Sequence, residues 1–227
     1  MYLIANFKAH QVNISDYTAQ LTPYSDTSLK IILSPPFPYL TAATMSPFSI
    51  CSQDVSAFDD GPFTGEVTAK MLRSISVDFC LVGHSERRIY FHENGSLLTK
   101  KIGMCLENEI QPIICVGETR EEHLEGNYLK VIETQIEDIF IPSSFSPIIA
   151  YEPVWAIGSG QTPDPSTIRA VIDTIKNKLP ESKVLYGGSV QSQNARMLSA
   201  HTDGLLVGSA SVDVKKFIQI IQQLETF

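Results

Sequence analysis

The pattern that decides the fold is clearest in the stretch Ile148-Ile149-Ala150-Tyr151-Glu152-Pro153. Its first four residues form a short apolar run typical of a buried strand, and Pro153 ends that strand directly after Glu152. A helical pattern follows Asp164-Pro165, a capping residue with proline in the first turn, and its apolar residues recur at helical spacing: Ile168, Val171, Ile172, Ile175 and Leu179. The segment therefore predicts one strand, one loop and one helix.

Similar short apolar runs recur along the whole chain. They are too short for helices and lack strict alternation, as expected of parallel strands that are buried on both faces. We predict eight strands: Tyr2–Asn6, Lys30–Ser34, Phe48–Ser52, Phe79–Gly83, Pro112–Val116, Ile148–Tyr151, Lys183–Tyr186 and Gly204–Val207.

Helical patterns lie between these runs. Two further amphipathic stripes extend from Leu124 to Ile139 and from Val214 to Leu224, whereas Ser15–Leu21 and Tyr39–Met45 are weak patterns of barely two turns. Such stripes indicate helix faces that pack on a core rather than cofactor sites. A strand followed by a helix, repeated eight times without a linker, predicts an α/β fold, a single-domain (β/α)8 barrel over residues 1–227, in preference to an open doubly wound sheet.

Length and charge agree with a barrel and narrow the possible partners. The chain has 227 residues, of which 43% are hydrophobic, enough for one large core. Its formal net charge of −8 comes without a Lys/Arg block, which argues against nucleic acid and anionic membranes as partners. A small anionic substrate remains compatible, because backbone N–H groups at helix N-termini bind anions.

The apolar runs, the start of the chain and the cysteine spacing together predict a cytosolic protein. No apolar run approaches the roughly 20 residues of a membrane span, and Met1–Ala5 lacks the basic start of a signal peptide. We therefore expect a cytoplasmic protein. The four cysteines lack CxxC spacing, so we expect buried, reduced thiols rather than disulfides or a metal site: Cys51, Cys80, Cys105 and Cys115.

Polar residues follow the ends of several predicted strands. In a barrel these ends lie on one face, so the residues after them meet in one place. They are Asn6 and Lys8, His84-Ser85-Glu86-Arg87, Glu152, Gly187-Gly188-Ser189, and Gly208-Ser209. Each has an ordinary explanation when taken alone, such as a surface cation or a tight turn. Their shared position favours a functional site.

Glu152 has the most suggestive surroundings. An apolar strand delivers this carboxylate into a loop that contains Gly158 and Gly160, and the glycines give the loop freedom to close over a ligand. A solvated glutamate at a strand end is the alternative interpretation for this segment. The residues after the other strands favour a buried base under a moving lid.

Long motifs at these same places resemble the triosephosphate isomerase family. They span nearly the whole chain: Asn6-Phe7-Lys8, Ser52-Gln53-Asp54-Val55-Ser56, Thr64-Gly65-Glu66, Gly83-His84-Ser85-Glu86-Arg87-Arg88, Cys115-Val116-Gly117-Glu118-Thr119, the segment from Tyr151 to Thr162, Tyr186-Gly187-Gly188-Ser189-Val190 and Leu206-Val207-Gly208. The resemblance implies a cytosolic enzyme of glycolysis and gluconeogenesis without cofactor or metal. It also implies a homodimer that interconverts dihydroxyacetone phosphate and D-glyceraldehyde 3-phosphate through an enediolate.

The resemblance also implies roles for individual residues. Glu152 matches the base and His84 the neutral electrophile, and this family is itself the standard example of such acid–base tuning, so both roles come from the resemblance. Lys8 and Asn6 match groups that contact the developing oxyanion and the phosphate. Glu86 and Cys115 match side chains that lie behind the catalytic groups.

Substrate-binding and subunit-contact residues follow in the same way. The backbone N–H groups of the glycine-rich loops are suited to a phosphate dianion, and the matching positions are Gly158, Ser189, Gly208 and Ser209, with Ile157 and Leu206 as apolar clamps. The loop Ala57–Glu66 resembles the segment that docks into a neighbouring subunit, so Thr64 and Gln53 are the expected dimer contacts.

Two departures from the family pattern bear on the site. Ser209 stands where a second glycine is usual, so a hydroxymethyl group enters the expected phosphate pocket. Pro163 stands at the far end of the lid, where proline fixes one dihedral angle. We expect a modest effect on substrate affinity from the first and a stiffer hinge from the second.

Other kinds of protein share parts of this pattern. A different barrel enzyme for phosphorylated substrates, such as an aldolase or an indole-glycerol-phosphate-type synthase, would have the fold and the phosphate site. An aldolase, however, needs a Schiff-base lysine at an inner strand position, and no predicted strand offers a lysine at such a position. A phosphometabolite-binding scaffold would keep the glycines without needing Glu152 or His84. A purely structural barrel would explain none of the clustering.

Overall fold

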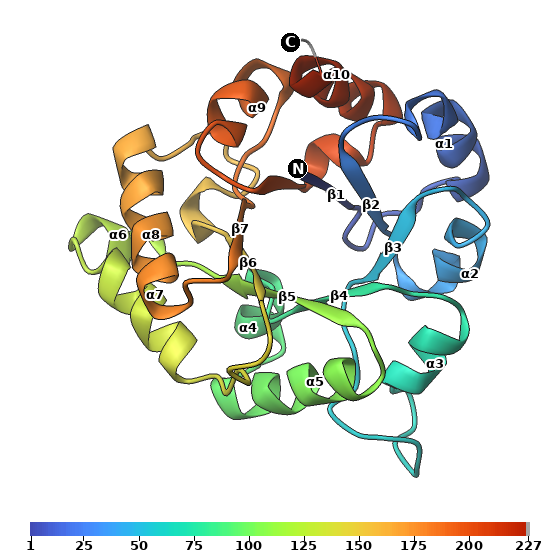
Figure 1. Ribbon diagram of the computed structural model, residues 1–227, viewed down its shortest axis with the longest axis horizontal. Coiled ribbons are helices and arrows are strands. Elements are labelled where there is room, and N and C mark those ends of the chain that lie inside the picture. Colours follow the sequence, from blue (N-terminus) through green and yellow to red (C-terminus); the bar gives the residue numbers. More distant parts are fainter. Residues whose placement is uncertain (226–227) are drawn as a thin grey trace.

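The computed structural model describes residues 1–225, and these form a closed barrel of eight parallel strands (Figure 1). The strands are β1 (Tyr2–Asn6), β2 (Lys30–Ser34), β3 (Ser49–Ser52), β4 (Phe79–Val82), β5 (Gln111–Val116), β6 (Ile148–Tyr151), β7 (Lys183–Tyr186) and β8 (Gly204–Val207). They pair in sequence order, and β8 closes the ring on β1. The predicted (β/α)8 barrel is confirmed, and the last two residues of the predicted domain range, 226 and 227, lie outside the described residues.

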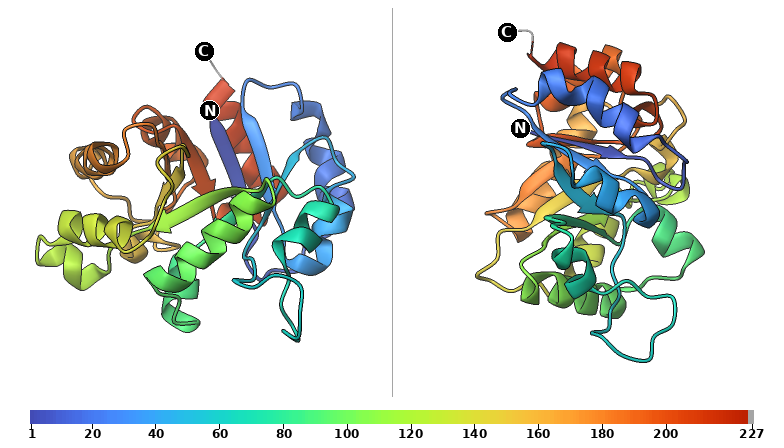
Figure 2. Two further views of the ribbon diagram at one scale, coloured as in Figure 1. Left: turned by 60° about the horizontal axis from the view of Figure 1, so that its bottom comes forward. Right: turned by 90° about the vertical axis from the view of Figure 1, so that its right-hand side faces the viewer.

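The helices form a ring outside the strands (Figures 1 and 2). They are α1 (Ile14–Leu21), α2 (Leu40–Ala43), α3 (Ala69–Ser74), α4 (Ser85–Tyr90), α5 (Gly95–Glu107), α6 (Arg120–Leu124), α7 (Tyr128–Glu137), α8 (Pro165–Lys178), α9 (Ser192–Ser199) and α10 (Val214–Glu225). Four 3-10 turns join them to the strands: η1 (Thr22–Tyr24), η2 (Phe37–Tyr39), η3 (Val154–Ala156) and η4 (Ser209–Ser211). None of the helices within residues 1–225 is long and apolar enough to cross a membrane.

One amphipathic stripe that was predicted as a continuous helix forms two helices in the structure. The stripe from Leu124 to Ile139 is divided between α6 and α7, because Gly126 takes a left-handed conformation with a φ of 75° and ends the first helix. Leu124 consequently remains 75% exposed instead of packing on the core.

The core has two layers, which is why the strand sequences do not alternate between apolar and polar. In β1, Leu3 and Ala5 pack against the surrounding helices, whereas Ile4 points into the barrel interior beside Ile32 and Leu206. The four cysteines are all buried and free, as expected from the sequence.

The parallel register brings the carboxyl ends of the strands to one rim. Asn6 at the end of β1 pairs with Ser34, and Tyr151 at the end of β6 pairs with both Val116 and Tyr186. The loops that carry the predicted site residues therefore emerge together.

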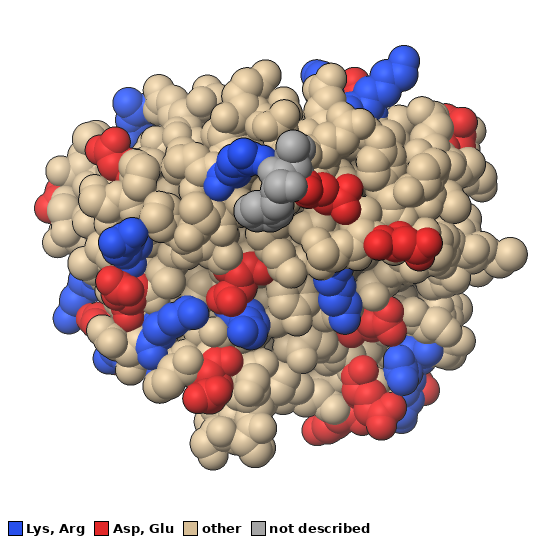
Figure 3. All heavy atoms as spheres, turned by 45° about the horizontal axis from the view of Figure 1, so that its top comes forward, with Lys and Arg blue, Asp and Glu red and all other residues tan. Residues whose placement is uncertain are grey.

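On the face drawn in Figure 3, positive and negative side chains are interspersed rather than gathered by sign.

Candidate active site

A cavity of about 270 Å³ opens at this rim. Loops that follow β1, β4, β6, β7 and β8 all contribute to it. Thirteen of the residues named from the sequence line it: Asn6, Lys8, His84, Glu86, Glu152, Ile157, Gly158, Gly187, Gly188, Ser189, Leu206, Gly208 and Ser209. The fold thus gathers groups that are far apart in the sequence.

Glu152 lies at the bottom of the cavity, only 1% exposed. Its backbone N–H donates to the Val116 carbonyl at 2.8 Å, which continues the β5–β6 pairing by one residue. In the side chain, Oε2 accepts a hydrogen bond of 3.1 Å from the Ser85 N–H. Oε1 lies 3.1 Å from His84 Nε2 but accepts no aligned hydrogen bond from residues 1–225. A buried carboxylate oxygen without a hydrogen-bond donor is well suited to accept a proton.

Two glycines make room for this carboxylate. A Cβ on Gly187 would lie 2.9 Å from Glu152 Cγ, and a Cβ on Gly117 would lie 1.8 Å from the Glu152 carbonyl oxygen. Both distances are too short for a side chain. Gly117, after β5, therefore leaves room for the backbone of Glu152, and Gly187, after β7, leaves room for its side chain.

His84 is the N-cap of α4, and its Nδ1 accepts a hydrogen bond from the Glu86 N–H at 3.3 Å. A backbone N–H can only donate, so Nδ1 carries a lone pair, and the proton of a neutral imidazole is on Nε2. That nitrogen faces Glu152 and the cavity. The geometry provides an uncharged N–H donor.

Lys8 is held by contacts from three directions. Its Nζ lies 2.6 Å from Glu86 Oε1, and its backbone N–H donates to Asn6 Oδ1 at 3.0 Å. The φ of Lys8 is 49°, an unfavourable value for a side chain with a Cβ. The Gln53 amide donates to the carbonyls of Lys8 and Ser34, at 2.8 Å each, and fixes this loop. This contact within the chain was not anticipated from the sequence.

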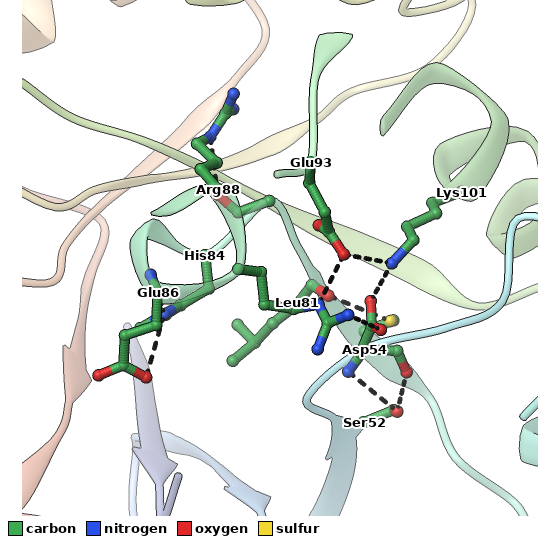
Figure 4. A network of polar contacts seen from close by, with 11 residues as sticks. Ser52, Asp54, Leu81, His84, Glu86, Arg88, Glu93 and Lys101 are labelled. Atoms are coloured by element: carbon green, nitrogen blue, oxygen red, sulfur yellow. Dashed lines mark hydrogen bonds and ion pairs between the residues drawn. The ribbon is translucent and has the colours of Figure 1, made fainter. Parts of the chain in front are cut away.

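A buried ion network anchors α4 on the side away from the cavity (Figure 4). Arg87 bonds Asp54 at 2.8 Å and Glu93 at 2.6 Å, and Lys101 bonds the same two carboxylates at 2.5 Å each. The network joins α4 to the loop after β3 and to α5. It therefore fixes the helix start that carries His84.

Cys115 lies outside the cavity lining, behind Glu152. Burial, and then the negative charge of Glu152, raise the pKa of its thiol well above the ordinary range. The thiol is therefore neutral and adds no second negative charge beside the carboxylate. Arg88 supports this region by donating hydrogen bonds of 2.9 Å to the carbonyls of Gly83 and Cys115.

The far side of the cavity is rich in backbone donors. Within residues 1–225, the N–H groups of Ser189, Gly208 and Ser209 make no hydrogen bond. The Ser189 carbonyl accepts from Asn194 Nδ2 at 2.9 Å, which ties this loop to the start of α9. Unpaired donors beside Lys8 suit an anionic group of the substrate.

The lid contributes Ile157 and Gly158 to the cavity lining. Gly158 and Gly160 have φ values of 65° and 76°, which glycine adopts without strain. The sequence analysis assigned no role to three further lining residues, His10, Val190 and Val212. Each lies in a loop after a strand that had already contributed to the site. Their position after these strands could have identified them from the sequence, whereas their residue types could not.

Thr64 does not reach this cavity but lies on the loop between β3 and α3. Gln53 also lies outside the lining of this cavity, although it positions Lys8. Within residues 1–225, no cluster of three or more His, Cys, Asp or Glu side chains is arranged to hold a metal ion.

Comparison with known proteins gives one consistent result. The triosephosphate isomerase family model matches residues 1–224. The triosephosphate isomerase of Blochmanniella floridana is 36% identical, and the match covers 96% of this chain and 94% of that protein. Those of Hahella chejuensis and Chlamydia trachomatis serovar D are 36% and 40% identical and cover 86% and 84% of this chain, and 85% and 76% of their own lengths.

Proposed function

Since this chain belongs to the triosephosphate isomerase family, we propose that Glu152, His84 and Lys8 carry the family's reaction in the cavity at the barrel rim. The enzyme interconverts dihydroxyacetone phosphate and D-glyceraldehyde 3-phosphate, a step of glycolysis and gluconeogenesis. The main support for this proposal is the buried carboxylate of Glu152. Its Oε1 faces the imidazole of His84 and accepts no aligned hydrogen bond from residues 1–225.

The reaction moves a proton between neighbouring carbons. Glu152 removes the proton from the carbon beside the carbonyl, and the electron pair of the broken C–H bond forms an enediolate. His84 Nε2–H donates to the oxygen where negative charge develops, and the Lys8 ammonium adds a positive charge nearby. The proton of the neighbouring hydroxyl passes to the other oxygen through His84 Nε2, and Glu152 returns its own proton to the adjacent carbon, so that the carbonyl and the hydroxyl exchange places. Asn6 holds the Lys8 loop, and Glu86 and Cys115 lie behind these groups.

The phosphate group has its own place in this proposal. The backbone N–H groups of Ser189, Gly208 and Ser209 bind it, and Gly158 of the lid joins them on closure. Ile157 and Leu206 supply the apolar surface beside the reacting carbons. Closing the lid excludes water, which protects the enediolate from side reactions.

A coupled assay for the isomerisation of glyceraldehyde 3-phosphate tests the role of Glu152. Glu152→Asp withdraws the carboxylate by one methylene, so we expect kcat to fall by about 10²-fold or more, with a smaller change in KM. Glu121→Asp, the same change at an exposed glutamate of α6, is the control and should retain activity. A Glu152→Asp enzyme with the kcat of the unsubstituted protein would overturn this assignment.

We also propose that two copies of the chain form an isologous dimer. The loop Ala57–Glu66 projects from the barrel (Figure 2) and carries Phe58 and Phe63, whose rings stack at 4.2 Å yet are 43% and 38% exposed. A partly apolar hollow of about 330 Å³ lies beside Lys8 and is suited to bind this loop of a second copy. Its lining includes Pro36, Phe37, Pro38, Gln53 and Phe91. Insertion of the loop of each copy, with Thr64 at its tip, into the hollow of the other would bury these rings.

Sedimentation velocity tests the dimer. We expect twice the mass of the 25.1 kDa chain at micromolar concentration, and dissociation in Phe63→Asp. Phe140→Asp changes a 70% exposed phenylalanine outside this loop and should leave the mass unaltered. A wild-type chain that sediments at 25.1 kDa would contradict the proposal.

We further propose that the whole chain is a single domain and acts in the cytoplasm. The closed ring from β1 to β8 supports the first statement, because removing any unit would open the barrel. The substrate supports the second, since a glycolytic intermediate is used where glycolysis takes place.

A further inference from the structure

The side chain of Tyr17 on α1 lies beneath the loop that follows β8. It is 3% exposed and packs edge-on against Phe7, with ring centroids 4.9 Å apart and an interplanar angle of 79°. Phe217 of α10 contacts its other side at 6.5 Å. Because Phe7 directly precedes Lys8, the ring of Tyr17 supports one wall of the cavity.

The hydroxyl of Tyr17 reaches the opposite wall. It donates a hydrogen bond of 2.8 Å to the carbonyl of Ser211, the last residue of η4. A phenol is protonated, and therefore a donor, at neutral pH, and burial raises the pKa of Tyr17 further. Ser211 is itself fully buried, and its Oγ lies within hydrogen-bond distance of the carbonyls of Gly208, at 2.7 Å, and Asn6, at 3.1 Å.

These contacts matter because η4 has little rigidity of its own. It spans three residues, and its internal bonds run from the Ser211 N–H to Gly208 at 2.8 Å and from the Val212 N–H to Ser209 at 3.4 Å. Such short 3-10 turns are weakly held by their own hydrogen bonds. Gly208 and Ser209 line the cavity, and their N–H groups need a fixed direction to bind an anion well.

We propose that Tyr17 and Ser211 are positioning residues for the substrate's phosphate group, which hold the donors of Gly208 and Ser209 at a set place relative to Lys8. The inference rests on the phosphate site described under Proposed function. Tyr17 links the two walls directly, through its ring on one side and its hydroxyl on the other, and Ser211 repeats the link through Asn6.

Tyr17→Phe removes the hydroxyl and keeps the ring contacts. Loss of one buried hydrogen bond predicts a roughly threefold to tenfold rise in KM for glyceraldehyde 3-phosphate, with an equal rise in the inhibition constant of inorganic phosphate. The kcat/KM for D-glyceraldehyde, which lacks a phosphate, should not change. Tyr24→Phe removes a hydroxyl that accepts a hydrogen bond of 3.0 Å from Gln222 Nε2 of α10 and does not contact η4, so this variant should alter none of these constants.

Ser211→Ala should produce the same pattern. Because both side chains act through η4, we expect the combined variant to show less than the product of the two single effects. The proposal would be overturned if Tyr17→Phe left unchanged both the KM for glyceraldehyde 3-phosphate and the inhibition constant of inorganic phosphate. An equal loss toward D-glyceraldehyde would also overturn it, because it would indicate a general disturbance of the barrel.

A third variant separates this inference from the phosphate site on which it rests. Ser209→Asp introduces a carboxylate among the expected phosphate donors and should raise KM strongly. If it does and Tyr17→Phe does not, the site stands and the positioning role falls. If Ser209→Asp leaves KM unchanged, the phosphate site itself is misplaced, and both proposals fall.

Discussion

At the scale of single residues, the site depends on space as much as on reactive groups. Glu152 can occupy the bottom of the cavity only because the residues at 117 and 187 lack a Cβ. Conformational freedom is not the reason at Gly187, since what it supplies is room beside the Glu152 side chain. The Gly-Gly-Ser motif after β7 thus serves both the phosphate donors and the base.

Gly187→Ala should displace the carboxylate, because the new Cβ would lie 2.9 Å from Glu152 Cγ. We expect kcat to fall by roughly 10-fold to 10²-fold while KM changes less, since a displacement near 1 Å misaligns the base. Steady-state kinetics measures this. Gly103→Ala on α5 is the control, because its Cβ would meet no atom within 4 Å. Equal kcat values in the two variants would refute the steric argument.

At the scale of elements, the lid combines two flexible positions with one stiff one. Gly158 and Gly160 have positive φ, whereas Pro163 at the far end allows little change in its own φ. We predict that Pro163→Ala speeds lid opening and closing, as measured by NMR relaxation dispersion on lid residues. Identical exchange rates in both proteins would show that Pro163 does not limit the motion.

The ion network behind α4 makes a second prediction at this scale. Lys101→Met leaves the buried carboxylate of Glu93 and the partly buried one of Asp54 with Arg87 as their only cation within residues 1–225. Removing one partner of a buried ion pair costs about 3–5 kcal/mol in the free energy of unfolding. Urea denaturation measures the loss. Lys100→Met, at the exposed neighbour, should cost little, and a similar stability for both variants would contradict a structural role.

Most elements could be predicted from the sequence because their signals are local. The strand bounds agree with the structure except for one residue at one end of β3, β4 and β5. The helix α8 was marked by Asp164-Pro165 and by its apolar stripe. The break at Gly126 was missed because the apolar spacing continues across it, although a glycine followed by asparagine is itself a signal for the end of a helix.

The candidate site divides in the same way. Glu152, His84 and Lys8 could be found from long motifs at strand ends, and the register then brings them together. The contacts of Gln53 with Lys8 and of Tyr17 with Ser211 join residues 45 and 194 positions apart. No local pattern predicts such pairs, because they arise only when the barrel closes.

At the scale of the whole molecule, the buried thiols link stability to pH. Burial raises the pKa of Cys51 to about 12 and that of Cys80 and Cys115 well above the ordinary range. In the unfolded chain these thiols ionise near pH ~8.5. Above that pH the unfolded state therefore binds fewer protons than the folded state, and the free energy of unfolding falls as pH rises.

We expect each such thiol to lower the stability by about 1–2 kcal/mol between pH 8 and pH 10. Urea unfolding across this range measures the decline. Cys51→Ala removes one of the thiols, so its stability should decline less steeply with pH than that of the wild type. Parallel declines for the two proteins would show that Cys51 makes no such contribution.

The central claim is that Glu152 moves a proton through an enediolate, and isomerisation in D₂O tests it most directly. A carboxyl group that has taken the proton exchanges it with solvent, so dihydroxyacetone phosphate formed from glyceraldehyde 3-phosphate should carry deuterium at the carbon that accepts the proton. Mass spectrometry or NMR of the product detects the label, and Glu152→Gln should form almost no product. Rapid product formation by Glu152→Gln, or a wild-type product wholly free of deuterium, would contradict the account.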